Sequence, residues 1–136
     1  MMIHHEGTKD TKEEALRVSH AVIGAAIEVH RHLGAGLLES LYEEALCREL
    51  WLRGLSAERQ VALPIAYKGA ELGSSLRIDV VVERLVVVEV KAVESIASIH
   101  RVQLLTYLKL TRLPVGLLIN FNAELLRHGV RRVLNG

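Results

Sequence analysis

The sequence predicts a single α/β domain in which a mixed β-sheet is flanked by helices, with the element order α-α-β-β-β-α-β. Three observations predict this class. The chain has 136 residues, the usual size of one compact domain. Half of its residues are hydrophobic and 24% are charged, a balance typical of globular proteins and not of disordered ones. Segments with helical spacing of apolar residues surround a central stretch rich in Val and Ile.

Helical spacing of apolar residues predicts three helices, over residues 11–33, 37–52 and 95–111. The first is expected to open on a capping box, in which Thr11 is followed three residues later by Glu14. The polar residues 1–10 before it are expected to form a flexible segment, which leaves residues 11–136 as the folded domain.

Stretches rich in β-branched residues predict strands over residues 60–67, 75–83, 85–91 and 115–120, followed by a last strand that ends at Val133-Leu134. Pro64 places the first strand at an edge of the sheet, because proline cannot donate a ladder hydrogen bond. Three strands in succession, then a helix and another strand, imply a sheet with both antiparallel and parallel pairs.

Charge and cysteine content limit the classes of function. The net charge of +1 is too small to indicate nucleic-acid binding by itself. The single cysteine, Cys47, suits a reducing compartment, and neither a secretory signal nor an apolar run long enough to span a bilayer is apparent. We expect a soluble cytoplasmic protein that does not associate with membranes.

The hairpin over residues 77–91 carries the charged residues of greatest interest. Strand residues alternate between the two faces of a sheet, so one face of this hairpin is expected to hold six aliphatic residues: Ile78, Val80, Val82, Val86, Val88 and Val90. If these residues pack on the core, Asp79, Glu89 and Lys91 project together from the opposite face.

The length of the turn decides whether the two carboxylates meet. A two-residue turn at Glu83-Arg84 would place Asp79 beside Val88 and away from Glu89. A three-residue turn, or one bulge, would instead pair Asp79 with Glu89. We favour the second register because it keeps the six aliphatic residues on one face.

Two paired carboxylates repel each other unless a proton or a cation lies between them. Mg²⁺ prefers oxygen ligands and also contacts phosphate oxygens, so we expect Mg²⁺ at Asp79 and Glu89, with Mn²⁺ as an alternative. Lys91 would then position or help to deprotonate an attacking water. A surface hairpin with three solvated charges is the alternative interpretation.

Two further motifs surround the hairpin. Residues 36–42 read Gly-Leu-Leu-Glu-Ser-Leu-Tyr, and residues 103–107 read Gln-Leu-Leu-Thr-Tyr. With Asn120-Phe121 after the later strand, this order of motifs resembles the GxxExxY protein family of the PD-(D/E)XK nuclease superfamily. The resemblance covers roughly residues 11–122. Ile78 stands where the superfamily name has proline.

This resemblance implies a restriction-endonuclease-like core and assigns roles to residues of the hairpin. Asp79 and Glu89 would be metal ligands, with the backbone carbonyl of Val90 as a third ligand. Lys91 would be the catalytic lysine.

The resemblance also implies three residues outside the hairpin. Glu39 would be an extra acidic residue beside the metal, while Gln103 and Tyr107 would border the site and contact the nucleic-acid backbone or order Lys91. Each has a structural alternative. Glu39 favours a helix N-terminus through the helix dipole, Gln103 suits a helix surface or a buried cap, and Tyr107 suits a core position.

The function expected from these features is a Mg²⁺-dependent nuclease that hydrolyses phosphodiester bonds, with DNA as the substrate. One alternative is a nuclease-fold protein that binds nucleic acid or a protein partner without cutting. The small size and weak net charge favour that alternative, or a nuclease that works as a homo-oligomer or with a protein partner. A metal-dependent hydrolase of small phosphorylated molecules would need a closed pocket.

Overall fold

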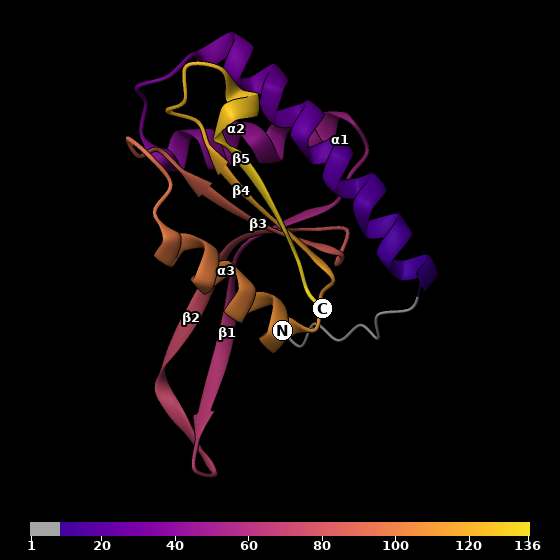
Figure 1. Ribbon diagram of the computed structural model, residues 1–136, viewed down its shortest axis with the longest axis vertical. Helices are drawn as coiled ribbons and strands as arrows, with labels where there is room; N and C mark the ends of the chain where they lie inside the picture. Colours follow the sequence, from indigo (N-terminus) through magenta and orange to yellow (C-terminus); the bar gives the residue numbers. More distant parts are fainter. Residues whose placement is uncertain (1–8) are drawn as a thin grey trace.

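The computed structural model describes residues 9–136. A five-stranded sheet lies between helices, and the predicted fold class is confirmed (Figure 1). The elements along the chain are α1 (Lys9–Leu33), α2 (Glu39–Leu52), β1 (Ala57–Tyr67), β2 (Ala70–Val82), β3 (Val86–Lys91), α3 (Ser98–Thr111), β4 (Val115–Asn120), the 3₁₀ turn η1 (Leu126–Gly129) and β5 (Val130–Leu134).

The strands lie in the sheet in chain order, from β1 at one edge to β5 at the other. Strands β3 and β4 pair in parallel, and every other neighbouring pair is antiparallel. A parallel pair needs a crossover connection, which α3 provides. Figure 1 shows α1 and α2 on one face of the sheet and α3 on the other.

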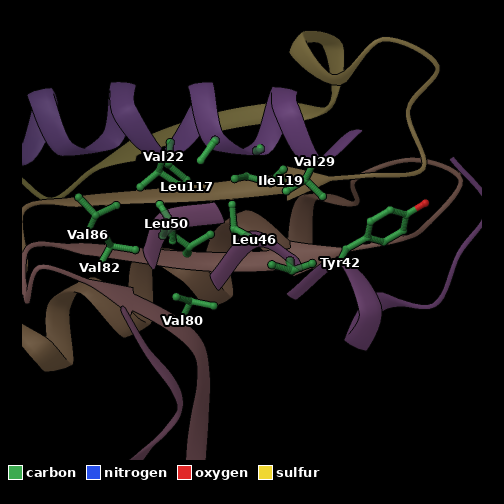
Figure 2. Packing of buried hydrophobic residues seen from close by; sticks show 14 of the residues in the cluster. Val22, Val29, Tyr42, Leu46, Leu50, Val80, Val82, Val86, Leu117 and Ile119 are labelled. Carbon is green, nitrogen blue, oxygen red and sulfur yellow. The ribbon is translucent and has the colours of Figure 1, made fainter. Parts of the chain in front are cut away.

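The central strands β3 and β4 are therefore buried on both faces. The larger core packs α1 and α2 on aliphatic side chains that include Val86, Val88 and Leu117 (Figure 2). The smaller core packs α3 on the opposite face, where Val87 and Leu118 lie. Central strands buried on both faces explain why β3 and β4 read as almost continuous aliphatic runs.

Tyr42 closes the larger core at the loop between α1 and α2. Its ring stacks on Phe121 with 4.7 Å between the centroids and 8° between the planes. The hydroxyl donates to the carbonyl of Gly34 and accepts a hydrogen bond from the backbone N–H of Leu37 at 3.1 Å. In Figure 2 the hydroxyl points away from the other labelled side chains, so the ring fills the core while the oxygen fixes the loop.

All three helices start elsewhere than the sequence predicted, and α2 begins at Glu39, two residues later than expected. Helix α1 already includes Lys9 and Asp10, so the capping box predicted at Thr11 does not mark its first turn. Of the predicted flexible segment, residues 1–8 lie outside the described part of the chain. Helix α3 begins at Ser98, three residues later than expected, because the backbone N–H of Ala97 donates to Nδ1 of His100 at 3.1 Å and so closes the first turn there.

Strands β1 and β2 extend well beyond the rest of the sheet. They pair from Ala57↔Val82 to Tyr67↔Ala70, whereas β2 pairs with β3 only from Val80 to Val82. The outer part of the two strands is therefore a ribbon that projects from the domain (Figure 1). Pro64 lies in β1, at the sheet edge as predicted, and the register shifts by a bulge just after it.

The turn η1 packs tightly on the end of β4 through Gly129. A Cβ added at Gly129 would collide with the carbonyl oxygen of Asn120 and lie 2.9 Å from Cβ of Ala123. Because backbone atoms cannot move aside as a flexible side chain does, this position excludes any larger residue.

We therefore predict that Gly129→Ala lowers the free energy of unfolding by roughly 1–3 kcal/mol, the usual cost of an overpacked site. Urea denaturation followed by circular dichroism measures the effect. Gly73→Ala is the matched control, since a Cβ there meets no atom within 4 Å. Equal stability of the two variants would contradict this account of η1.

Candidate active site

The hairpin between β2 and β3 has the register that the sequence analysis favoured. Its pairs are Val82↔Val86, Val81↔Val87 and Val80↔Val88, which leaves three residues in the turn. The next position in this register places Asp79 opposite Glu89. Two of the three turn residues, Glu83 and Arg84, have φ values of 53° and 54°, and they turn the chain sharply enough for Leu85 to bond back to Val82 at 2.9 Å.

The backbone ladder between β2 and β3 ends at these two carboxylates. The N–H of Asp79 donates to Oε2 of Glu89 at 2.8 Å, and the N–H of Val90 donates to Oδ2 of Asp79 at 2.9 Å. Side-chain oxygens thus take the place of backbone carbonyls in the ladder. The two strands diverge here, and both acidic side chains lie in the fork between them.

The alternation of faces is interrupted at the same place, and the predicted faces of Ile78 and Asp79 were both wrong. Five of the six predicted aliphatic residues lie in the larger core, but Ile78 lies in the smaller core beside Val81 and Val87. Gln60 and Asp79, which would pair across β1 and β2, are missing from the ladder, and Gln60 has a φ of 50°. This break turns the side chain of Asp79 towards α2.

A cavity of about 370 Å³ opens between the start of α2 and the fork of the strands. Its lining includes Glu39, Glu43, Gln60, Asp79 and Val90. The cavity therefore brings together acidic groups from two separate elements, α2 and β2.

Burial controls the protonation of the two carboxylates. Glu89 is only 4% exposed, and this burial, together with the charge of Asp79, raises its pKa to about 8. Burial also raises the pKa of Asp79, against the hydrogen bond from Val90 and the charge of Lys91, which lower it. At neutral pH the pair therefore favours a proton or a cation between the two groups.

Lys91 is half-buried at the end of β3, and its carbonyl accepts a hydrogen bond from Phe121 at 2.9 Å. Its charge lies near enough to lower the pKa of both Asp79 and Glu89. Within residues 9–136, no carboxylate lies within ion-pair distance of it. The lysine is thus available to a substrate or a water molecule.

The residues predicted outside the hairpin differ in their placement. Glu39 lines the cavity, and its carboxylate accepts a hydrogen bond from the backbone N–H of Ala92 at 3.2 Å. Tyr107 is 4% exposed on α3, and its pKa is raised by burial and then by the charges of Glu89 and Asp79, so its hydroxyl faces the fork from the other side. Gln103 is exposed, and the structure does not bring it into the cavity.

Sequence reasoning missed Glu43, which also lines the cavity. It is 6% exposed and accepts hydrogen bonds from Nη2 of Arg59 at 3.0 Å and from Nε2 of Gln60 at 2.7 Å. The available signal was its spacing: Glu43 follows Glu39 by four residues, so both carboxylates lie on one face of α2.

The donor atoms of the fork fit a hard divalent cation. One carboxylate oxygen of Asp79 accepts from the N–H of Val90, and one of Glu89 accepts from the N–H of Asp79. The second oxygen of each carboxylate accepts no hydrogen bond within residues 9–136. Carboxylate and carbonyl oxygens are the ligands that Mg²⁺ and Mn²⁺ prefer. Nowhere in the described chain do three or more His, Cys, Asp or Glu side chains form a complete metal cage, so water or phosphate oxygens would complete the coordination.

Comparison with known protein families gives the same picture. A model described as the PD-(D/E)XK nuclease superfamily matches residues 16–133, which is most of the chain and includes the whole fork. The chain belongs to the PD-(D/E)XK nuclease superfamily. PD-(D/E)XK nucleases generally use divalent metals and act on nucleic acids.

No protein of curated function and no solved structure matches the chain. Among the described helices of this PD-(D/E)XK superfamily member, none has the length and apolar character needed to cross a membrane.

We predict that the metal-free protein loses stability as the pH rises. The folded state holds the proton of Glu89 up to about pH 8, whereas an unperturbed glutamate releases it near 4.5. The folded state therefore binds more protons between these values, and the free energy of unfolding falls across them, by an amount on the order of a few kcal/mol.

Urea denaturation in EDTA at about pH 5 and about pH 9 measures this slope. Glu89→Gln should flatten it, because the amide does not titrate. Glu58→Gln, which removes an exposed partner of Arg84, is the control and should keep the slope. An equal slope in wild type and Glu89→Gln would contradict the assignment.

Proposed function

We propose that this protein is a Mg²⁺-dependent nuclease of the GxxExxY type that hydrolyses phosphodiester bonds in DNA. The observation that carries the proposal is the bonding of the Asp79 and Glu89 carboxylates across the fork, which holds two groups with raised pKa values close together, with Asp79 lining the cavity. Their second oxygens and the carbonyl of Val90 would hold Mg²⁺ or Mn²⁺. The single cysteine supports a cytoplasmic location.

The bound cation would supply electrostatic stabilisation of the scissile phosphate and acidify an attached water. Lys91 would orient that water, and the positive charge of its ammonium, which has no ion-pair partner in the described chain, would favour loss of the water's proton to solvent. The same charge would stabilise negative charge that develops on the phosphate.

The remaining predicted residues support this chemistry from two sides. Glu39, from the start of α2, would accept a hydrogen bond from a metal-bound water, in addition to the one it accepts from Ala92. The hydroxyl of Tyr107 approaches from α3 and would order Lys91 or contact the nucleic-acid backbone. Gln103, exposed on the same helix, would contact the backbone only when a substrate lies across α3.

One observation favours a second candidate function, binding of nucleic acid or a protein partner without cutting. The net charge of +1 provides little general attraction for DNA, so a nuclease of this size would depend on a second copy or a partner for substrate affinity. The intact set of Asp79, Glu89 and Lys91 favours catalysis, because a binding module has no use for two buried carboxylates facing phosphates.

We predict different effects for two substitutions in the fork. Asp79→Asn should weaken Mn²⁺ binding by about 10- to 100-fold, because it removes a charged ligand. Lys91→Ala should leave Mn²⁺ binding within a few-fold of wild type but lower the cleavage rate by about 10²- to 10⁴-fold. Calorimetric titration with Mn²⁺ measures the first effect, and cleavage of single- and double-stranded DNA and RNA with Mg²⁺ or Mn²⁺ measures the second.

Lys12→Ala, which removes a lysine near the start of α1, is the control for Lys91→Ala and should cleave as wild type does. Cleavage that persists unchanged in Lys91→Ala would overturn the mechanism. Retained binding of nucleic acid without any cleavage by the wild type would support the second candidate function.

A further inference from the structure

The position of Asp79 depends on Gln60, the residue opposite it on β1, with which it forms no ladder pair. Pairing between β1 and β2 is regular on both sides of Asp79, from Arg59↔Val80 to Val61↔Ile78. Only the intervening pair, Gln60 and Asp79, is missing. The irregularity is therefore confined to one position on each strand.

Gln60 adopts a backbone conformation that its residue type disfavours. Its φ of 50° is in the left-handed region, which is unfavourable for a residue with a Cβ and persists only where the surroundings hold it. Asn, Asp and Gly are the residues usually found there, so the sequence gives no local reason for this conformation at a glutamine.

Glu43 provides the holding contacts. Its two carboxylate oxygens bind consecutive residues of β1: Oε2 accepts from Arg59 at 3.0 Å, and Oε1 accepts from Gln60 at 2.7 Å. Glu43 lies on α2 and is 6% exposed, so its carboxylate is shielded from water. The two bonds hold the side chains of Arg59 and Gln60 against α2.

The consequence appears on β2. With regular alternation from Val80, Asp79 would face α3 and Ile78 would face α2, but Ile78 packs in the smaller core under α3 and Asp79 lines the cavity beside α2. We propose that Glu43 is a positioning residue, which acts through Gln60 to direct the Asp79 carboxylate into the cavity. This inference rests on the proposed function and deepens it, because it explains how Asp79, one of the two proposed metal ligands, is positioned.

A test of this inference uses the fact that glycine adopts the left-handed conformation without strain. Glu43→Gln keeps the shape of the side chain but replaces one acceptor with a donor, so it cannot accept from both Arg59 and Gln60. Gln60→Gly removes the need for the holding contact. In the double variant, Gln60→Gly should therefore restore the position of Asp79 that Glu43→Gln alone disturbs.

The readout is hydrogen exchange of the Val90 amide, which donates to Oδ2 of Asp79. Protection of this amide should fall by about tenfold or more in Glu43→Gln and stay within a few-fold of wild type in Gln60→Gly. The double variant should recover to the level of Gln60→Gly. Mn²⁺ affinity should follow the same order, with a loss of about 10- to 100-fold in Glu43→Gln.

Glu49→Gln is the matched control, since Glu49 lies on the same helix and bonds Arg53 at 2.8 Å near the surface; it should leave the Val90 amide unchanged. If Glu43→Gln does not fold, Gln60→Ala replaces it: alanine is strained in the left-handed region, so it should lose the protection that Gln60→Gly keeps.

Full protection of the Val90 amide in Glu43→Gln, or in Gln60→Ala when that variant is used, would overturn the proposal. A double variant whose Val90 amide is as unprotected as in Glu43→Gln would also overturn it. The amide measurement needs neither metal nor substrate. A wild-type protein that neither binds Mn²⁺ nor cuts DNA would therefore refute the proposed function without deciding this inference.

Discussion

The candidate site depends on the point where β2 and β3 stop pairing. Each strand there offers a backbone N–H that has no carbonyl opposite it, and each N–H is satisfied by a carboxylate of the other strand. The same two bonds thus complete the backbone hydrogen bonding and fix Asp79 and Glu89 relative to each other. They also bury negative charge, which is costly without a cation or a proton. The local fold and the need for a cation or a proton at the fork therefore have one physical origin.

Much of this arrangement follows from local pattern. Alternation of aliphatic residues predicted both arms of the hairpin. Burial of one aliphatic face predicted a turn with an odd number of residues, and the pairing of Val82 with Val86 confirms it. The face of Ile78 was wrong because alternation assumes an unbroken ladder. The break arises from Glu43, 17 residues before Gln60 in the chain, and a contact over that separation leaves no mark on the periodicity of either strand.

The residues around the fork show a similar limit. Gln103 and Tyr107 are four residues apart on α3, and the sequence analysis placed both at the border of the site. The buried face of α3 consists of Leu104, Tyr107, Leu108 and Thr111, and Gln103 lies just beside it. Spacing therefore indicates which residues lie near one face of a helix. It does not show that Tyr107, and not Gln103, lies close enough to Glu89 and Asp79 for their charges to raise its pKa.

The burial of Glu89 links stability to the state of the site. Because the pKa of Glu89 is raised to about 8, its ionisation lowers the free energy of unfolding. A more exposed glutamate would remove that cost, but it would also be screened by water and would hold a cation more weakly. Binding of a cation to the folded state alone recovers the lost stability in proportion to its affinity. The domain is thus most stable when a proton or a cation neutralises the fork.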